Sequence, residues 1–207
     1  MEGEDGGETL GYLPSPPCRP AGTGELVINE VVSRPGGVDV DHDGASNGHD
    51  EVVEVVSRAD EAIHLGGTSL WWKGERRGGI VQSVCLPPRT AAVIVAPDGG
   101  NLKLPSGAVA VLLDRTLRLT DSGGKLEMRS VAGTTLDAVS VPAAVTPSAP
   151  AVWSRTRDAD WNALLRSHNE VSGATRPSSI GRCANAERFP CCVDWLDAYE
   201  EKGRLSE

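Results

Sequence analysis

The residues whose types and spacing could do chemistry lie in the acidic loop Asp39-Val-Asp-His-Asp-Gly44 and its end at Asp50-Glu51. Alternate carboxylates followed by a glycine are how a short loop wraps oxygen ligands around a hard cation such as Ca²⁺. The twelve-position calcium loop predicts these metal ligands: Asp39, Asp41, Asp43, Asn47, Asp50 and the adjacent Glu51. The alternative is a solvated acidic loop that binds nothing.

Other polar groups are weaker candidates for chemistry. His42 and His49 flank the acidic loop, where exposed histidines are favoured over a transition-metal site. Glu30 and Glu54 are residue types that hydrolyse glycosidic bonds as pairs, but the pattern predicts no cleft around them. A turn sequence follows His168-Asn-Glu170, which disfavours a nuclease-type metal site. The sequence therefore predicts no catalytic residue.

Trp71 and Trp72 are the candidate ligand-binding residues. Adjacent residues of a strand face opposite ways, so one of the two indoles faces outward unless something covers the sheet. An exposed Trp beside Lys73 would stack on a sugar or a peptide. The alternative is that the C-terminal part of the chain covers the second Trp.

The five cysteines are an odd number, and three of them lie near the C-terminus, at Cys183, Cys191 and Cys192. Adjacent cysteines pair badly with each other, so Cys183 is predicted to pair with Cys191 or Cys192. The remaining one is expected to reach Cys18 or Cys85, and the fifth to stay free or to pair between chains. Disulfides persist in oxidising compartments, so this arrangement predicts export.

Composition limits the partners. The formal net charge is −9, which disfavours nucleic acid and gives no attraction to anionic lipid. No apolar run approaches the length of a membrane span, so no membrane insertion is expected. The acidic N-terminus contains no apolar signal region, so no signal peptide is expected in this form of the chain.

The acidic loop must be positioned by strands, because β-branched runs stand on both sides of it. Many short runs of this kind, separated by glycine turns, predict an all-β sandwich. The predicted strands are Glu25–Ser33, Glu51–Ser57, Thr68–Lys73, Ile80–Leu86, Thr90–Ala96, Ala108–Leu113, Lys125–Ser130 and Thr134–Val141.

Four segments follow from this pattern. Residues 1–23 form a flexible Pro/Gly-rich lead-in, and residues 24–145 form the sandwich. Residues 146–182 are expected to be an irregular arm that packs on the sandwich, anchored by Trp153 and Trp161. Residues 183–207 contain the clustered cysteines and an apolar stripe that predicts a short C-terminal helix.

The order of several motifs resembles the lamin-tail domain of bacterial secreted and envelope proteins. The matching segments are Leu26-Val-Ile-Asn-Glu30, Asp50–Val56, Asp60–Leu70, Leu86–Val95, Val131–Val139, and Trp153-Ser-Arg-Thr followed by Trp161. The C-terminal cysteine-containing segment lies outside the pattern. The resemblance implies an immunoglobulin-like β-sandwich with a binding or scaffolding role and no catalytic residues.

We therefore expect a non-enzymatic binding or scaffolding module, extracellular or in the cell envelope, whose partner is a protein or a glycan at the cell surface. One alternative is a carbohydrate-binding accessory module of a secreted hydrolase that uses Trp71 and Trp72. The other is a metal-dependent hydrolase centred on the acidic loop.

Overall fold

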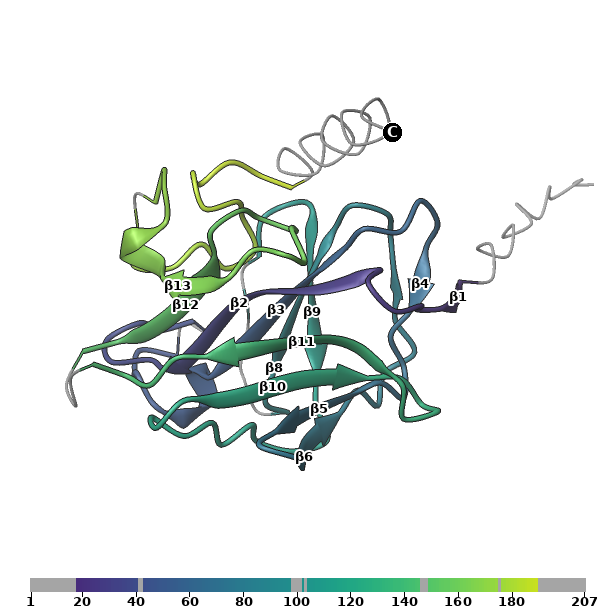
Figure 1. The fold of residues 1–207 in the computed structure, drawn as a ribbon, viewed down its shortest axis with the longest axis horizontal. Helices are drawn as coiled ribbons and strands as arrows, with labels where there is room; N and C mark the ends of the chain where they lie inside the picture. The colour runs from purple at the N-terminus through teal and green to yellow at the C-terminus, as the bar shows by residue number, and fades with distance from the viewer. Residues whose placement is uncertain are drawn as a thin grey trace, which may run out of the picture.

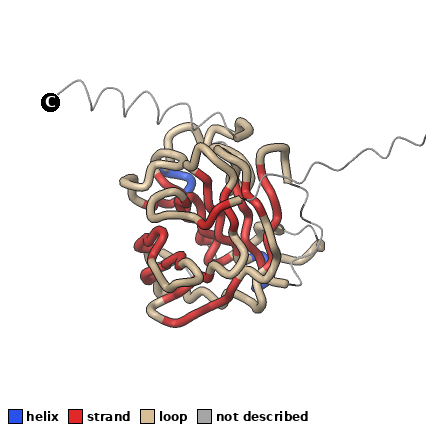
Figure 2. Tube along the Cα trace, turned by 90° about the vertical axis from the view of Figure 1, so that its right-hand side faces the viewer, coloured by secondary structure: helices blue, strands red, loops and turns tan. Residues whose placement is uncertain are grey.

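The structure is a computed structural model that describes residues 18–40, 43–97, 102, 104–145, 149–174 and 176–189. Strands form the body of the protein, and its helical content is two single 3-10 turns within these residues, which confirms the predicted all-β class (Figures 1 and 2). The strands are β1 (Arg19–Pro20), β2 (Leu26–Arg34), β3 (Val52–Ser57), β4 (Ile63–His64), β5 (Ser69–Trp72), β6 (Glu75–Gly79), β7 (Cys85–Leu86), β8 (Ala91–Val95), β9 (Ala108–Leu112), β10 (Gly124–Arg129), β11 (Thr135–Val141), β12 (Ala151–Arg155) and β13 (Leu165–Ser167). The 3-10 turns are η1 (Gly48–Asp50) and η2 (His168–Glu170).

The strands form three sheets in a sandwich-like arrangement. The largest has the order β13-β12-β2-β3-β8-β9, and a four-stranded sheet with the order β11-β10-β5-β6 faces it. A small sheet, β1-β4-β7, lies at one end. Most neighbouring strands are antiparallel, which suits the short glycine turns, but β8 and β9 run parallel.

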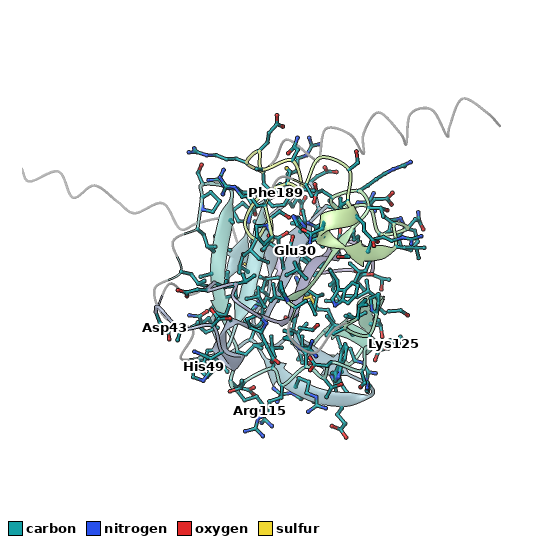
Figure 3. The ribbon with its side chains drawn as sticks, turned by 90° about the vertical axis from the view of Figure 1, so that its left-hand side faces the viewer. Glu30, Asp43, His49, Arg115, Lys125 and Phe189 are labelled. Atoms are coloured by element: carbon teal, nitrogen blue, oxygen red, sulfur yellow. A yellow bond between two sulfur atoms is a disulfide. The ribbon has the colours of Figure 1, made fainter. Side chains whose placement is uncertain are left out.

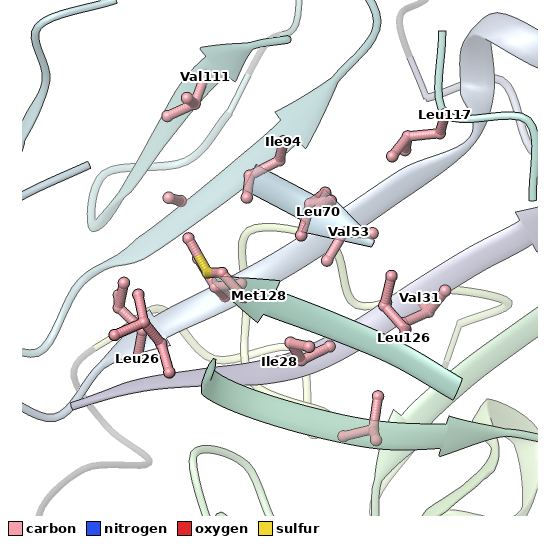
Figure 4. Close-up of a cluster of buried hydrophobic side chains, with 14 of the residues drawn as sticks. Leu26, Ile28, Val31, Val53, Leu70, Ile94, Val111, Leu117, Leu126 and Met128 are labelled. Atoms are coloured by element: carbon pink, nitrogen blue, oxygen red, sulfur yellow. The ribbon is translucent and has the colours of Figure 1, made fainter. Parts of the chain in front are cut away.

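The main core fills the space between the two larger sheets (Figure 4). Ile28, Val53 and Ile94 project into it from the six-stranded sheet, and Leu126 and Met128 come from the opposite sheet. Each of these side chains has no exposed surface. Burying one such side chain stabilises the fold by roughly 1.5–3 kcal/mol, so this layer is the main source of cohesion.

The six-stranded sheet is also buried on its outer face. Val32, Val52 and Val93 point to that face and pack in a second cluster with Ile180. Because both faces are covered, β2, β3 and β8 are buried along almost their whole length and do not show the alternation of a half-exposed strand.

Several predicted elements differ from the observed ones. The predicted strand Ile80–Leu86 is observed only in part. Ile80 forms an isolated bridge, and Cys85 and Leu86 form β7, while the residues between them form no strand. The Gly78-Gly79 pair, expected to be a turn, ends β6 instead. The predicted irregular arm contains β12 and β13, which extend the six-stranded sheet. The expected C-terminal helix lies outside the described residues.

The disulfide pattern also corrects the sequence analysis. Cys18 and Cys85 pair with each other, and this bond fastens β1 to the end of the sandwich next to β7. Neither of them is therefore available to the C-terminal cysteines. Cys183 is disulfide-bonded as well. Cys191 and Cys192 lie outside the described residues, so the choice between them as its partner stays a prediction.

Candidate functional site

Asp50 organises the acidic loop from inside. Its side chain is fully buried, and it accepts hydrogen bonds from the backbone N–H of Val40 at 2.6 Å and of Asn47 at 2.8 Å. The Asn47 side chain in turn accepts the N–H of His49, which completes a capping box around η1. Asp50 therefore joins the two ends of the loop through hydrogen bonds. As a calcium ligand it would have to bind the cation with oxygens that already accept these hydrogen bonds.

The two outer carboxylates of the loop also bind backbone groups. Asp39 accepts the N–H of Gly44 at 3.1 Å, and Asp43 accepts the N–H of Ala45 at 2.7 Å. Gly44 has a φ of +92°, which explains the glycine at this turn. Asp39 Oδ1 is buried and without a hydrogen-bond partner.

The predicted calcium ligands are not gathered around one point among the described residues. Asp41 and His42 lie outside the described residues, and among the described ones no group of three or more His, Cys, Asp or Glu side chains is placed to hold a metal ion. Figure 3 shows Asp43 and His49 at the margin of the molecule, well away from Glu30.

Glu51 turns away from the loop and belongs to a different contact. Its carboxylate accepts the N–H of Leu119 at 3.1 Å and so fastens the segment that follows β9. Burial raises the pKa of Glu51 to about 7, and the nearby charge of Asp121 acts in the same direction. One oxygen of the Glu51 carboxylate is therefore already engaged by the segment that follows β9.

The two adjacent tryptophans differ sharply in exposure. Trp72 is fully buried, and its indole N–H donates to Thr120. The sandwich core covers it, rather than the C-terminal part of the chain. Trp71 lies on the outer face of the four-stranded sheet, where the guanidinium of Arg129 sits 4.1 Å from the ring centroid. This stack covers the indole face that a sugar ring would need.

A buried acidic cluster lies on the outer face of the six-stranded sheet. Glu30 and Glu54 stand directly opposite each other on β2 and β3, and neither has any exposed surface. A bulge at Asn29 directs its amide toward the same face, where it donates to Glu54 at 2.9 Å and to Asp158 at 3.0 Å. The carboxylates come together because the bulge turns Glu30 to the outer face, with Val32, and the alternation of β3 turns Glu54 to that face, with Val52.

The Glu30 carboxylate accepts hydrogen bonds on both of its oxygens. It accepts the hydroxyl groups of Ser154 at 2.9 Å and Ser178 at 2.7 Å, together with the N–H and the hydroxyl of Ser179. Burial raises the pKa of Glu54 well above its ordinary value, and the charge of Glu30 adds to that effect. Burial also raises the pKa of Asp158.

The cluster contains residue types that hydrolases use, in a different geometry. Ser154 Oγ lies 2.7 Å from His168 Nδ1, but the same hydroxyl is also bonded to Glu30. Ser154 is fully buried and His168 is 1% exposed, so no substrate reaches the hydroxyl. A triad needs an accessible nucleophile and a histidine between it and the acid, and this cluster has neither. Its hydrogen bonds join β2 and β12 to residues 178 and 179.

The chain matches no family model and none of the curated proteins. Among the described residues, no helix is long and apolar enough to cross a membrane.

A rigid loop with exposed apolar side chains is the feature that the sequence analysis missed. Trp153 is buried as expected, but Trp161 is 53% exposed and Leu164 is 67% exposed, so the expected anchoring by Trp161 is wrong. Arg155 holds the loop between β12 and β13 from below. Its guanidinium donates to the carbonyls of Trp161 at 2.8 Å and Ala163 at 2.7 Å.

Arg155 is itself fixed on the sandwich. It is 1% exposed, donates to the carbonyl of Ile28 at 2.7 Å, and pairs with Asp137 at 2.8 Å. Asp137 also accepts the N–H of Ile28, so both sheets contribute to the support. The exposed Trp161 and Leu164 therefore stand on a backbone with a defined shape.

Proposed function

We propose that this protein is a non-enzymatic binding or scaffolding module that recognises a partner protein through the loop between β12 and β13. The observation that carries the proposal is the exposed pair Trp161 and Leu164 on a backbone held by the buried Arg155. Trp and Arg dominate the energetically important positions of protein interfaces, and a preformed loop loses little conformational entropy when it binds.

The structure supports a protein partner better than a glycan. Arg129 stacks on one face of the Trp71 indole, and Trp72 is buried, which leaves less aromatic surface for a sugar at this sheet. At the exposed loop, Leu164 presents an aliphatic side chain that suits an apolar pocket of a protein and offers no hydrogen bond to a sugar.

The disulfide between Cys18 and Cys85 supports work outside the cytoplasm, at the cell surface or in the envelope.

Replacing Asn162, which is exposed in the same loop, by a photo-crosslinking residue tests the proposal. In an envelope extract we expect one dominant crosslinked protein, which excess wild-type protein competes away. A W161S/L164S competitor should be at least tenfold weaker, since loss of a buried aromatic anchor typically removes more than 2 kcal/mol of binding free energy.

The matched control competitor is V131S, because Val131 is 78% exposed and lies in a different loop. It should compete as well as the wild-type protein. Competition by W161S/L164S equal to that of the wild type would disprove the role of this loop. Glycan-array binding that disappears in a W71A variant would favour the carbohydrate-binding alternative.

The second part of the proposal is a calcium ion at the acidic loop, supported by the spacing of its carboxylates and by the buried, unpartnered Asp39 Oδ1. Calcium at ~100 times its Kd should stabilise the native state by roughly 2.7 kcal/mol and raise the thermal midpoint. The D41A variant should lose this shift, and the control D60A, an exposed carboxylate on another loop, should keep it. An unchanged midpoint at millimolar calcium would argue for a solvated loop.

A further inference from the structure

Residues 176–189, the C-terminal strap, lie across the outer face of the six-stranded sheet. Ile180 packs against the cluster that contains Val32 and Val93. Phe189 packs against Val56 and is 4% exposed. Figure 3 shows Phe189 and Glu30 at the same end of the molecule. The strap covers these buried side chains together with Val38, Leu102 and Leu104, which pack on the same cluster.

The strap is fastened to the sheet at successive backbone N–H groups. Ser179 donates to Glu30 at 3.1 Å, Gly181 donates to Glu54 at 2.5 Å, and Ala184 donates to Asp158 at 2.8 Å. Each carboxylate comes from a different part of the chain, namely β2, β3 and the loop after β12.

The same carboxylates repel one another. Glu30 and Glu54 are direct cross-strand neighbours, an arrangement that destabilises a sheet when both are charged. The titratable groups around Glu54 are Glu30 and Asp158, and His168 Nδ1 lies 3.5 Å from Glu30. The strap contributes neutral donors to this site. The acidic pair is therefore tolerated because the strap is in place and because protons are retained.

We propose that the C-terminal strap is a pH-sensitive latch, held by the Glu30, Glu54 and Asp158 carboxyl groups, that loosens as the pH rises and uncovers the part of the six-stranded sheet beneath Ile180 and Phe189. Opening exposes the Glu54 and Asp158 carboxyl groups to water and removes the burial that raises their pKa. The latched state binds more protons than the open state, so opening is coupled to proton release.

The direction follows from the pKa changes. Burial raises the pKa of Glu54 and of Asp158 in the latched state. A carboxyl group whose pKa is raised contributes stability that is fully present below its unfolded-state pKa and is lost as the pH rises through the folded-state value. The latch should therefore be tightest in mild acid and weakest in alkali.

Hydrogen exchange of the backbone amides, corrected for the intrinsic pH dependence of exchange, tests the latch in the full chain. Between pH 6 and pH 9, the protection of the Ser179 and Gly181 amides should fall at least tenfold. The amides of Val55 and Ile94, in the centre of the sheet, should keep their protection over the same range.

Two variants separate the latch from general instability. E54Q removes one charge of the opposed pair and should flatten the pH dependence of strap protection. S178A removes the hydroxyl that donates to Glu30 and accepts the N–H of Ile180, and should raise strap exchange at least fivefold at every pH, since losing one ordinary hydrogen bond already has roughly that effect. The control S122A, whose exposed hydroxyl lies on the opposite side of the sandwich, should leave strap exchange unchanged.

Strap protection that is constant from pH 6 to pH 9 in the wild-type protein would overturn the proposal, whatever the variants do. So would a fall that is equally large at Val55 and Ile94, because that result would report unfolding of the whole domain. The test is independent of the proposed binding loop, since no partner is present.

Discussion

Replacing Glu30 by alanine is expected to lower the free energy of unfolding by about 3–5 kcal/mol. The carboxylate accepts bonds from Ser154, Ser178 and Ser179 in a site with no exposed surface. Removing it leaves several buried donors unpaired, and each costs roughly 1–3 kcal/mol when water cannot reach it. The relief of repulsion with Glu54 offsets part of this loss. Urea unfolding followed by tryptophan fluorescence measures the change.

The matched control is E61A. Glu61 is exposed and pairs with Arg19 at 3.2 Å, and such surface pairs contribute about 0–1 kcal/mol. Its midpoint should move little. A loss below about 1 kcal/mol in E30A, with the strap amides still protected, would mean that the carboxylate is dispensable for holding the strap.

The strands of the sandwich were largely predictable because local patterns encode them. The β-branched runs that became β2, β3 and β8 carry their own signal, and glycine turns separate them. β12 and β13 escaped prediction because they are short and stand in a segment rich in Pro, Ser and Thr. β12 forms by pairing with β2, and β13 by pairing with β12, rather than by propensity.

The position of the acidic cluster could be predicted only in part from the sequence. The order of residues along β3 places Glu54 on the same face as Val52 and Val56, and this much is visible in the pattern. That the face is covered depends on Ser179 and Gly181, more than a hundred residues away. A long-range contact of this kind leaves no local signal, so the sequence did not predict that the two glutamates are buried together.

The exposed loop between β12 and β13 could not be predicted either, because here a residue expected to be buried is exposed. Trp161 was expected to be buried because aromatic residues usually are, yet Arg155 fixes the loop backbone through its carbonyls and leaves the indole outside. A fully buried arginine with backbone carbonyls as partners has no sequence signature, because most arginines are exposed.

Removing the disulfide between Cys18 and Cys85 is expected to lower the free energy of unfolding by about 4 kcal/mol. The bond joins residues 67 positions apart, so it strongly restricts the unfolded chain. In the native state, the β1 and β4 pairing and the ion pair of Arg19 with Glu25 remain, but a two-residue strand and exposed charges contribute little. The Arg19 amide, the one N–H of β1, should therefore exchange faster as well.

The variants C18A and C85A and the double variant distinguish the bond from the packing of either residue. Because all three remove the same bond, their free energies of unfolding should agree within about 0.5 kcal/mol. Variants serve better than a reducing agent, which would also attack the disulfide of Cys183. A double variant whose loss equals the sum of the single losses would show that packing of the two side chains, rather than the cross-link, stabilises this end of the sandwich.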